Sequence, residues 1–257
     1  MVISRSHEDA RRLRGRLRMG DNSISLQDNV NILGVEVDSR LLFDRHLVDV
    51  AQKASQNVTL LRRLRHLLDA DGLLTLYKAQ VRPIMEYAPL TWMSSARSHL
   101  TLLDKVQRRA ERLISNARQQ HLPRQPWRQR QQQQQQQQQR QEDRQVLRDT
   151  LDHRRKVAAL TVLHKAQIQN VPHLADLRAT WRRSERNTRT VLSNDLLLEA
   201  PRSRSSTHKR AFSSATVVWW NAFTAVVDVR RLSTQQMKET THRWLHTQPH
   251  YNVQYML

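Results

Sequence analysis

Apolar residues recur with the spacing of amphipathic α-helices, and this pattern constrains the fold more than any other feature of the chain. From residue 46 the apolar positions fall on one helical stripe: Leu47, Val50, Ala51, Ala54, Val58, Leu61, Leu64 and Leu68. Basic residues lie mostly off that stripe, at Lys53, Arg62, Arg63 and Arg65. Since an amphipathic helix buries its apolar side, the pattern predicts a packed helix with a basic outer surface.

Two further helices are predicted before residue 116. Asp69 or Asp71 is a candidate N-cap for the second helix, and Pro83 is expected to end or kink it. The apolar positions of that helix include Leu73, Leu76, Tyr77 and Val81. The third helix covers about 96–115 and turns apolar residues inward at Leu100, Leu103, Val106, Ala110, Leu113 and Ile114. Its basic residues point largely outward: Lys105, Arg108, Arg109 and Arg112.

The first forty residues favour short strands. Residues 23–26 alternate in polarity, and β-branched residues continue the extended character at Val30, Ile32, Val35 and Val37. Gly34 interrupts this run, which suggests a bulge or a close approach of another part of the chain.

A glutamine-rich segment, 118–145, breaks every periodic pattern. It holds nine consecutive glutamines at 131–139, with arginine and proline interleaved around them. Its low hydrophobicity cannot support a packed core, so we predict a disordered linker. Side-chain amides in such a run can form ladders of hydrogen bonds between stacked chains in cross-β structures, so self-association through this tract is expected.

Helical patterning returns after the linker. Leu151, Ala158 and Ala166 belong to one predicted helix, which Pro172 should stop. A later helix holds Phe212, Ala215, Trp219, Phe223, Val226 and Val227, with Ser206 or Thr207 as its N-cap. Trp219, Trp220 and Phe223 lie in an apolar helix and indicate core packing rather than base stacking. Ser233 and Gln236 make a candidate capping box, followed by Met237, Thr241 and Trp244 on one face.

These observations predict a mainly α fold: a helical bundle with a short N-terminal β-hairpin, a Gln-rich linker and a second helical region. The expected divisions are a β element at 1–38, a helical domain at 39–117, the linker at 118–145, a helical region at 146–246 and a tail at 247–257.

Charge indicates the class of partner. The 43 Lys and Arg residues against 23 acids give a net charge of +20, so a polyanion is expected, with nucleic acid before an acidic membrane surface. The absence of cysteine excludes disulfides, thiol catalysis and Cys-ligated zinc. Residues 1–20 lack the apolar segment of a signal peptide, and the longest strongly apolar run, 215–220, is far shorter than the roughly 20 residues of a spanning helix. We expect an intracellular protein without a membrane partner, in either nucleus or cytoplasm.

An ordered series of short segments carries a family resemblance. Residues 31–38 read Asn-Ile-Leu-Gly-Val-Glu-Val-Asp, and residues 76–88 read Leu-Tyr-Lys-Ala-Gln-Val-Arg-Pro-Ile-Met-Glu-Tyr-Ala. Together with 42–47 and 103–113, they resemble the region just after the catalytic palm in reverse transcriptases of non-LTR retrotransposons, the LINE and jockey-like group. Residues 154–165 and 212–223 resemble the C-terminal region of the same elements. The resemblance implies the thumb and post-thumb part of an RNA-directed DNA polymerase.

The carboxylates that such a polymerase needs are missing from this chain. Polymerisation requires acids that hold two Mg²⁺ ions, and the family supplies them partly from a Tyr-x-Asp-Asp turn, but no Asp-Asp pair occurs here. We therefore expect no catalytic residue, no metal ligand and no cofactor in this chain, with Mg²⁺ belonging only to the intact parent polymerase. The twelve histidines are interpreted as scattered, without His-x-x-x-His spacing near a glutamate, so a zincin-type metal site is not expected, and His46, His66, His99 and His153 are interpreted as helix-flanking or surface residues.

The remaining functional expectation is sequence-independent binding of RNA, DNA or their hybrid. In the resembling thumb, basic helix residues contact phosphate, and the candidates here are Arg62, Arg63, Lys78, Arg82, Lys105, Arg108 and Arg109. The resemblance also implies a primer-grip-like role for Leu33 and Gly34 in a hairpin. Two alternatives stay open: a helical protein-interaction module, or a decayed reading frame without a selected function.

Overall fold

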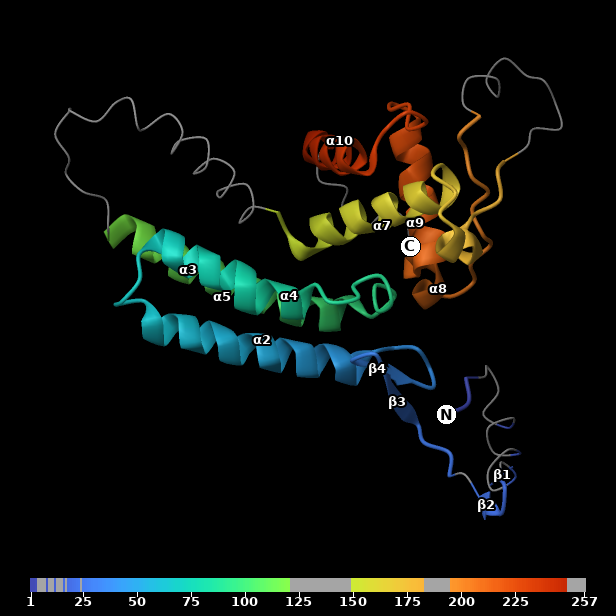
Figure 1. The fold of residues 1–257 in the computed structure, drawn as a ribbon, viewed down its shortest axis with the longest axis horizontal. Coiled ribbons are helices and arrows are strands. Elements are labelled where there is room, and N and C mark those ends of the chain that lie inside the picture. Colours follow the sequence, from blue (N-terminus) through green and yellow to red (C-terminus); the bar gives the residue numbers. More distant parts are fainter. Residues whose placement is uncertain are drawn as a thin grey trace. The chain divides into compact units, whose positions relative to one another are not determined.

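The computed structural model describes residues 1–3, 8, 12, 16, 18–23, 25–120, 149–182 and 195–248. The chain forms two compact units: the first consists of Met1–Ala88 and Ser95–Leu122, and the second of Pro89–Ser94 and Pro123–Leu257. The protein is mainly α-helical with a short N-terminal antiparallel hairpin, which confirms the predicted fold class (Figure 1). Most of the predicted Gln-rich linker and of the tail lies outside the described residues.

Two small hairpins precede the helices. The first pairs β1 (Arg18–Met19) with β2 (Asn22–Ser23), and the second pairs β3 (Asn29–Ile32) with β4 (Val35–Asp38). Ile32 pairs directly with Val35, so the turn between β3 and β4 has only two residues. Leu33 and Gly34 both have positive φ, 49° and 85°, as a tight hairpin turn demands.

This geometry corrects two expectations from the sequence. Gly34 is a turn residue and not a bulge, because the run of β-branched residues folds back on itself instead of continuing. The strand expected over 23–26 is reduced to the end of β2 at Ser23, and residues 25–27 have no regular structure.

The first long helix, α2 (Asp44–Leu64), begins after a turn organised by Asp38. The Asp38 carboxylate accepts backbone N–H bonds from Arg40, Leu42 and Phe43. The predicted stripe is buried at Leu47, Val50, Ala54, Val58 and Leu61. Leu68 was predicted on the same helix, but α2 ends at Leu64.

A second rod is built from three consecutive helical segments: α3 (Ala70–Leu76), the π-helical η1 (Tyr77–Val81) and α4 (Arg82–Met85). Asp69 is its N-cap, as predicted, and accepts the Gly72 N–H at 2.8 Å. Pro83 does not end the rod. It lies in the first turn of α4, where its missing N–H costs least, and the helix continues to Met85.

The third rod is α5 (Arg97–Gln120), which extends three residues into the segment predicted as linker. Contacts fix its direction. Asp44 and His99 form an ion pair near the starts of α2 and α5, whereas Arg118 near the end of α5 pairs with Asp71 at the start of α3. The helices α2 and α5 are therefore parallel, and the α3–α4 rod is antiparallel to both (Figure 1).

The second unit is organised around α7 (Leu151–Gln167). Around it lie the 3₁₀ turn η2 (Pro172–Leu177) and the helices α8 (Ser206–Arg210), α9 (Phe212–Thr224) and α10 (Thr234–Thr247). Its core gathers Leu160, Leu163, Leu196, Leu198, Val217, Trp220, Phe223, Val229 and Met237. Both α9 and α10 pack on α7, so α7 is buried on most sides rather than along one stripe.

Details of the second unit both confirm and correct the sequence interpretation. The capping box of Ser233 and Gln236 is present, and Met237 and Thr241 are buried behind it. Ser206 or Thr207 was predicted to cap the helix that holds Phe212 and Trp219, but Ser206 and Thr207 belong to the separate short helix α8, whose N-cap is Ser205. The fully buried tryptophan of α9 is Trp220, whereas Trp219 is only half-buried. Helix α7 ends at Gln167, before Pro172, which begins η2.

The segment Pro89–Ser94 belongs to the second unit although it lies between α4 and α5 in sequence, and its last three residues are buried. Trp92 is 1% exposed, and the Arg155 guanidinium lies 5.5 Å from its ring centroid. Among the helices of the described ranges, none is long and apolar enough to cross a membrane.

Candidate functional site

Basic residues of α5 gather on the exposed side of that helix. Residues three, four or seven positions apart share a helix side, and this spacing relates Lys105 to Arg108, Arg109 and Arg112. The Arg109 guanidinium donates to Ser55 Oγ of α2 at 3.2 Å, so Arg109 lies at the edge of this side that is next to the flank of α2. Arg62 follows Ser55 by seven residues and therefore lies on that flank too.

The acids of α5 occupy its other flank. Asp104 and Glu111 share their side of the helix with Gln107 and Arg118, and Arg118 pairs with Asp71 of α3 at 3.7 Å. Asp104 lies four residues before Arg108 and Glu111 three residues after it, so the acids adjoin the basic side at Arg108, whereas Arg109 lies at its other edge, next to α2. We call Arg62, Lys105, Arg108, Arg109 and Arg112 the α2–α5 basic face.

Residues of the α2–α5 basic face keep donors available. All five side chains are exposed, and none forms an ion pair with an acid in the described part of the chain. Arg108 and Arg112 each donate one Nε–H to a backbone carbonyl of the preceding turn, at 3.3 Å. A guanidinium has five N–H donors, so most of them remain for an anion.

Three predicted contact residues lie elsewhere. Arg63 follows Arg62 directly and so points to a different side of α2, away from the core. Lys78 is half-buried on η1. Arg82 is also half-buried, and it forms an ion pair with Glu86 at 3.0 Å, which already neutralises its charge.

Leu33 and Gly34, predicted as a primer-grip-like element, form the tip of the β3–β4 hairpin. Leu33 is 86% exposed, and its carbonyl accepts the Tyr87 hydroxyl at 2.7 Å. A Cβ added at Gly34 would lie 3.5 Å from the Tyr87 ring, so the close approach expected at this glycine is present. The tip is thereby tied to the end of the α4 segment.

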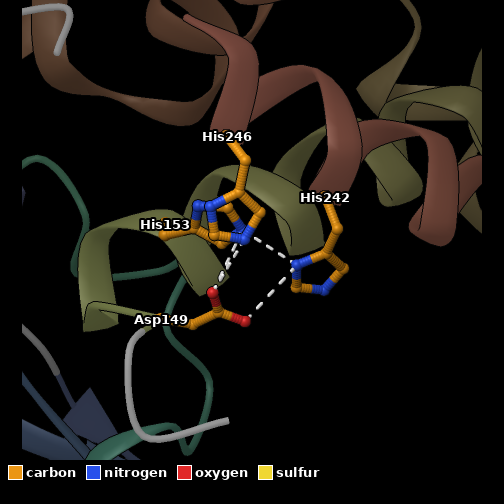
Figure 2. Close-up of side chains that lie close together, drawn as sticks. All are labelled: Asp149, His153, His242 and His246. Atoms are coloured by element: carbon orange, nitrogen blue, oxygen red, sulfur yellow. Dashed lines mark hydrogen bonds and ion pairs between the residues drawn. The ribbon is translucent and has the colours of Figure 1, made fainter. Parts of the chain in front are cut away.

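A second site combines one acid and three histidines in the second unit. Asp149, His153, His242 and His246 each offer a ligand atom, and these atoms all lie within 4.8 Å of one another (Figure 2). Asp149 is buried, His153 and His242 are half-buried, and His246 is exposed. We call these four residues the Asp–His cluster.

Helix ends position the Asp–His cluster. Asp149 precedes Thr150, the N-cap of α7, and the Thr150 hydroxyl accepts the His153 N–H at 3.1 Å. His242 and His246 lie one turn apart on α10. The core face of α10, with Met237 and Thr241 buried, fixes the rotation of that helix. The cluster therefore joins the start of α7 to the last turns of α10.

Burial decides the protonation state within the cluster. Desolvation lowers the pKa of His153 to about 4, against the opposing attraction of Asp149, and His242 and His246 lower it further. His153 Nε2 and His242 Nδ1 are 2.8 Å apart, a hydrogen-bond distance that requires one donor and one acceptor nitrogen. The imidazole of His153 is therefore neutral at physiological pH.

Sequence reasoning missed the Asp–His cluster. The expectation that no His-x-x-x-His pair lies near a glutamate was wrong, because His242 and His246 have this spacing on α10 and Glu239 lies three residues before His242. Asp149 and His153 are also four residues apart, and this spacing was the signal in the sequence that could have revealed the site. His46 and His153 were predicted to be helix-flanking or surface residues, and the surface part of this prediction was wrong, because little of either side chain is exposed to solvent.

Comparisons with known proteins add no relative. No family model, no curated protein and no solved structure matches the chain. The two sites are therefore interpreted from their own chemistry.

Proposed function

We propose that this chain is the thumb and post-thumb region of a non-LTR retrotransposon reverse transcriptase, and that it binds RNA, DNA or their hybrid without sequence preference. The α2–α5 basic face makes contact with phosphate. The protein acts inside the cell, and without the palm carboxylates it has no polymerase activity of its own.

The gathering of four exposed bases on one side of α5, none of them in an ion pair within the described residues, is the observation that carries this proposal. Arg109 extends this basic side toward the flank of α2, where Arg62 lies. Lys105 and Arg112 are seven residues apart, or about 10 Å along the axis. One strand of a duplex presents a phosphate about every 3.4 Å of axis, so the face spans about three phosphates.

The side chains suit phosphate contact better than base recognition. Trp220 and Phe223 are fully buried and cannot stack on bases. In the first unit, the exposed Tyr87 hydroxyl is bonded to the hairpin tip. Arginine and lysine then supply a sequence-independent and salt-dependent affinity, in keeping with a net charge of +20.

Binding of labelled duplex DNA, single-stranded RNA and RNA–DNA hybrid at several salt concentrations tests the proposal. We expect similar affinities for unrelated sequences and a steep loss with salt. The variant Arg62→Gln, Lys105→Gln, Arg108→Gln, Arg109→Gln should weaken all ligands, and on duplex DNA it should reduce the log–log salt slope by up to about 3.6 if each residue meets one phosphate.

A matched variant distinguishes the contribution of the α2–α5 basic face from that of the net charge of the chain. Gln at Arg202, Arg204, Lys209 and Lys238, all exposed in the second unit, removes the same number of charges. We expect this control to keep most of the salt slope. Equal losses in both variants, or a flat salt response of the unmodified chain, would contradict the proposal and favour the helical interaction module.

A further inference from the structure

We propose that the Asp–His cluster is a binding site for one divalent transition-metal ion of the zinc class, ligated by Asp149, His153, His242 and His246. This inference is independent of the α2–α5 basic face and concerns only the second unit.

The spacing of the donor atoms fits tetrahedral coordination. Zinc binds imidazole nitrogen and carboxylate oxygen at about 2.0–2.1 Å, so the edges of a tetrahedral site are about 3.3 Å. In Asp149, Oδ1 lies 3.1 Å from His246 Nε2 and 3.9 Å from His153 Nε2, and Oδ2 lies 3.6 Å from His242 Nδ1. His153 and His242 are 2.8 Å apart. These separations fall on both sides of the tetrahedral edge, and no pair exceeds 4.8 Å.

The donor set selects the class of metal. Imidazole suits zinc, copper, nickel and iron, while Mg²⁺ and Ca²⁺ prefer oxygen ligands. Three imidazoles and a carboxylate leave one negative charge on the ligands, which partly neutralises a dication. In Figure 2 the side chains of His242 and His246 from α10, His153 from α7 and Asp149 from just before α7 lie close together, as a chelating site requires.

Three imidazoles gathered around a carboxylate are hard to explain by hydrophobic packing alone. The ring centroid of His153 lies 4.9 Å from that of His242 and 4.6 Å from that of His246, so three rings crowd together. Protonation of several of them would place like charges at these distances. A bound dication uses the same lone pairs without that repulsion.

With protein ligands at all four positions, the site is structural rather than catalytic. It would fasten α10 to the start of α7, between residues 89 positions apart in sequence. His242 and His246 are more exposed than Asp149, so the ion can enter from their side. Binding to the folded chain alone raises its stability by mass action.

The test titrates the untagged, chelator-treated full-length chain with Zn²⁺ and, separately, with Co²⁺ and Mg²⁺. We expect one equivalent of tightly bound Zn²⁺, the visible absorption of tetrahedral Co²⁺, no comparable binding of Mg²⁺, and a rise in thermal midpoint on adding Zn²⁺. The variant His242→Ala, His246→Ala should lose Zn²⁺ affinity by more than about 100-fold and show no midpoint rise.

The control variant His66→Ala, His173→Ala removes two exposed histidines outside the cluster and should bind one equivalent as before. Asp149→Asn keeps the shape of the side chain and should weaken Zn²⁺ by at least about tenfold, which tests the site even if the histidine variant unfolds. Unchanged Zn²⁺ affinity in Asp149→Asn, equal losses in cluster and control variants, or the absence of a stoichiometric Zn²⁺ site in the unmodified chain would overturn the proposal.

Discussion

Replacing Trp220 by alanine should destabilise the second unit more than any other single truncation in α9. The side chain is fully buried and packs in a core with Leu160, Leu163 and Phe223. Its indole N–H donates to the Leu196 carbonyl at 2.8 Å. Burying about 200 Å² of aromatic surface at about 25 cal/mol per Å² contributes up to about 5 kcal/mol, and Trp→Ala changes in cores cost about 3–5 kcal/mol.

The neighbouring Trp219 provides the comparison. It is half-buried, and the Lys156 ammonium lies 5.6 Å from its ring centroid, a contact of about 0.5–1 kcal/mol at a partly exposed site. Trp219→Ala should therefore cost about 1–2 kcal/mol, well below Trp220→Ala. Trp220→Phe keeps an aromatic ring and loses the indole hydrogen bond, so it should fall between the two.

Urea unfolding of the full chain, followed by far-UV circular dichroism, measures these differences. If the two units unfold separately, only the transition of the second unit should move, with an unchanged slope. A larger loss in Trp219→Ala than in Trp220→Ala would show that the assignment of the buried tryptophan is wrong.

Two further predictions concern acid sensitivity and the hairpin turn. Burial lowers the pKa of His164, although its hydrogen bond to the Val229 carbonyl opposes this shift. As the pH falls below about 6.5, the unfolded chain takes up a proton at this histidine before the folded chain does, so the free energy of unfolding should fall by up to about 1.4 kcal/mol per pH unit. The variant His164→Gln should flatten this dependence in urea titrations at pH 5 to 7.5. Gly34→Ala should destabilise the first unit by about 1–2 kcal/mol because the φ of Gly34 is 85°. Gly34→Asn should cost less, since asparagine tolerates this conformation better than alanine does. Equal thermal midpoints for both variants and the unmodified chain would contradict this account.

The sequence by itself determined the helices of the first unit. Leu47, Val50, Ala54, Val58 and Leu61 share one side at the helical period, and burial of that side is the only way to remove them from water. Local chemistry also limited the N-cap to Asp69 or Asp71, of which the structure uses Asp69, and placed the capping box at Ser233, because a cap depends on residues within one turn. The missing Asp-Asp pair is likewise a fact of the sequence alone.

Tertiary structure decided features that the helical periodicity of the sequence leaves undetermined. In α9, Trp219 and Trp220 are adjacent in an apolar run, and packing against α7 and the Leu196–Leu198 segment determines which ring is enclosed. Which residues of α5 reach α2 also depends on the arrangement of three helices, and only that arrangement brings Arg109 to Ser55.

The Asp–His cluster shows this division most clearly. Each half was present in the sequence as a pair four residues apart, at 149 and 153 and again at 242 and 246. A helical period places each pair on one side of the chain but says nothing about its distance from the other pair. The packing of α10 on α7 brings His153 Nε2 to within 2.8 Å of His242 Nδ1, so the site exists only in the folded second unit.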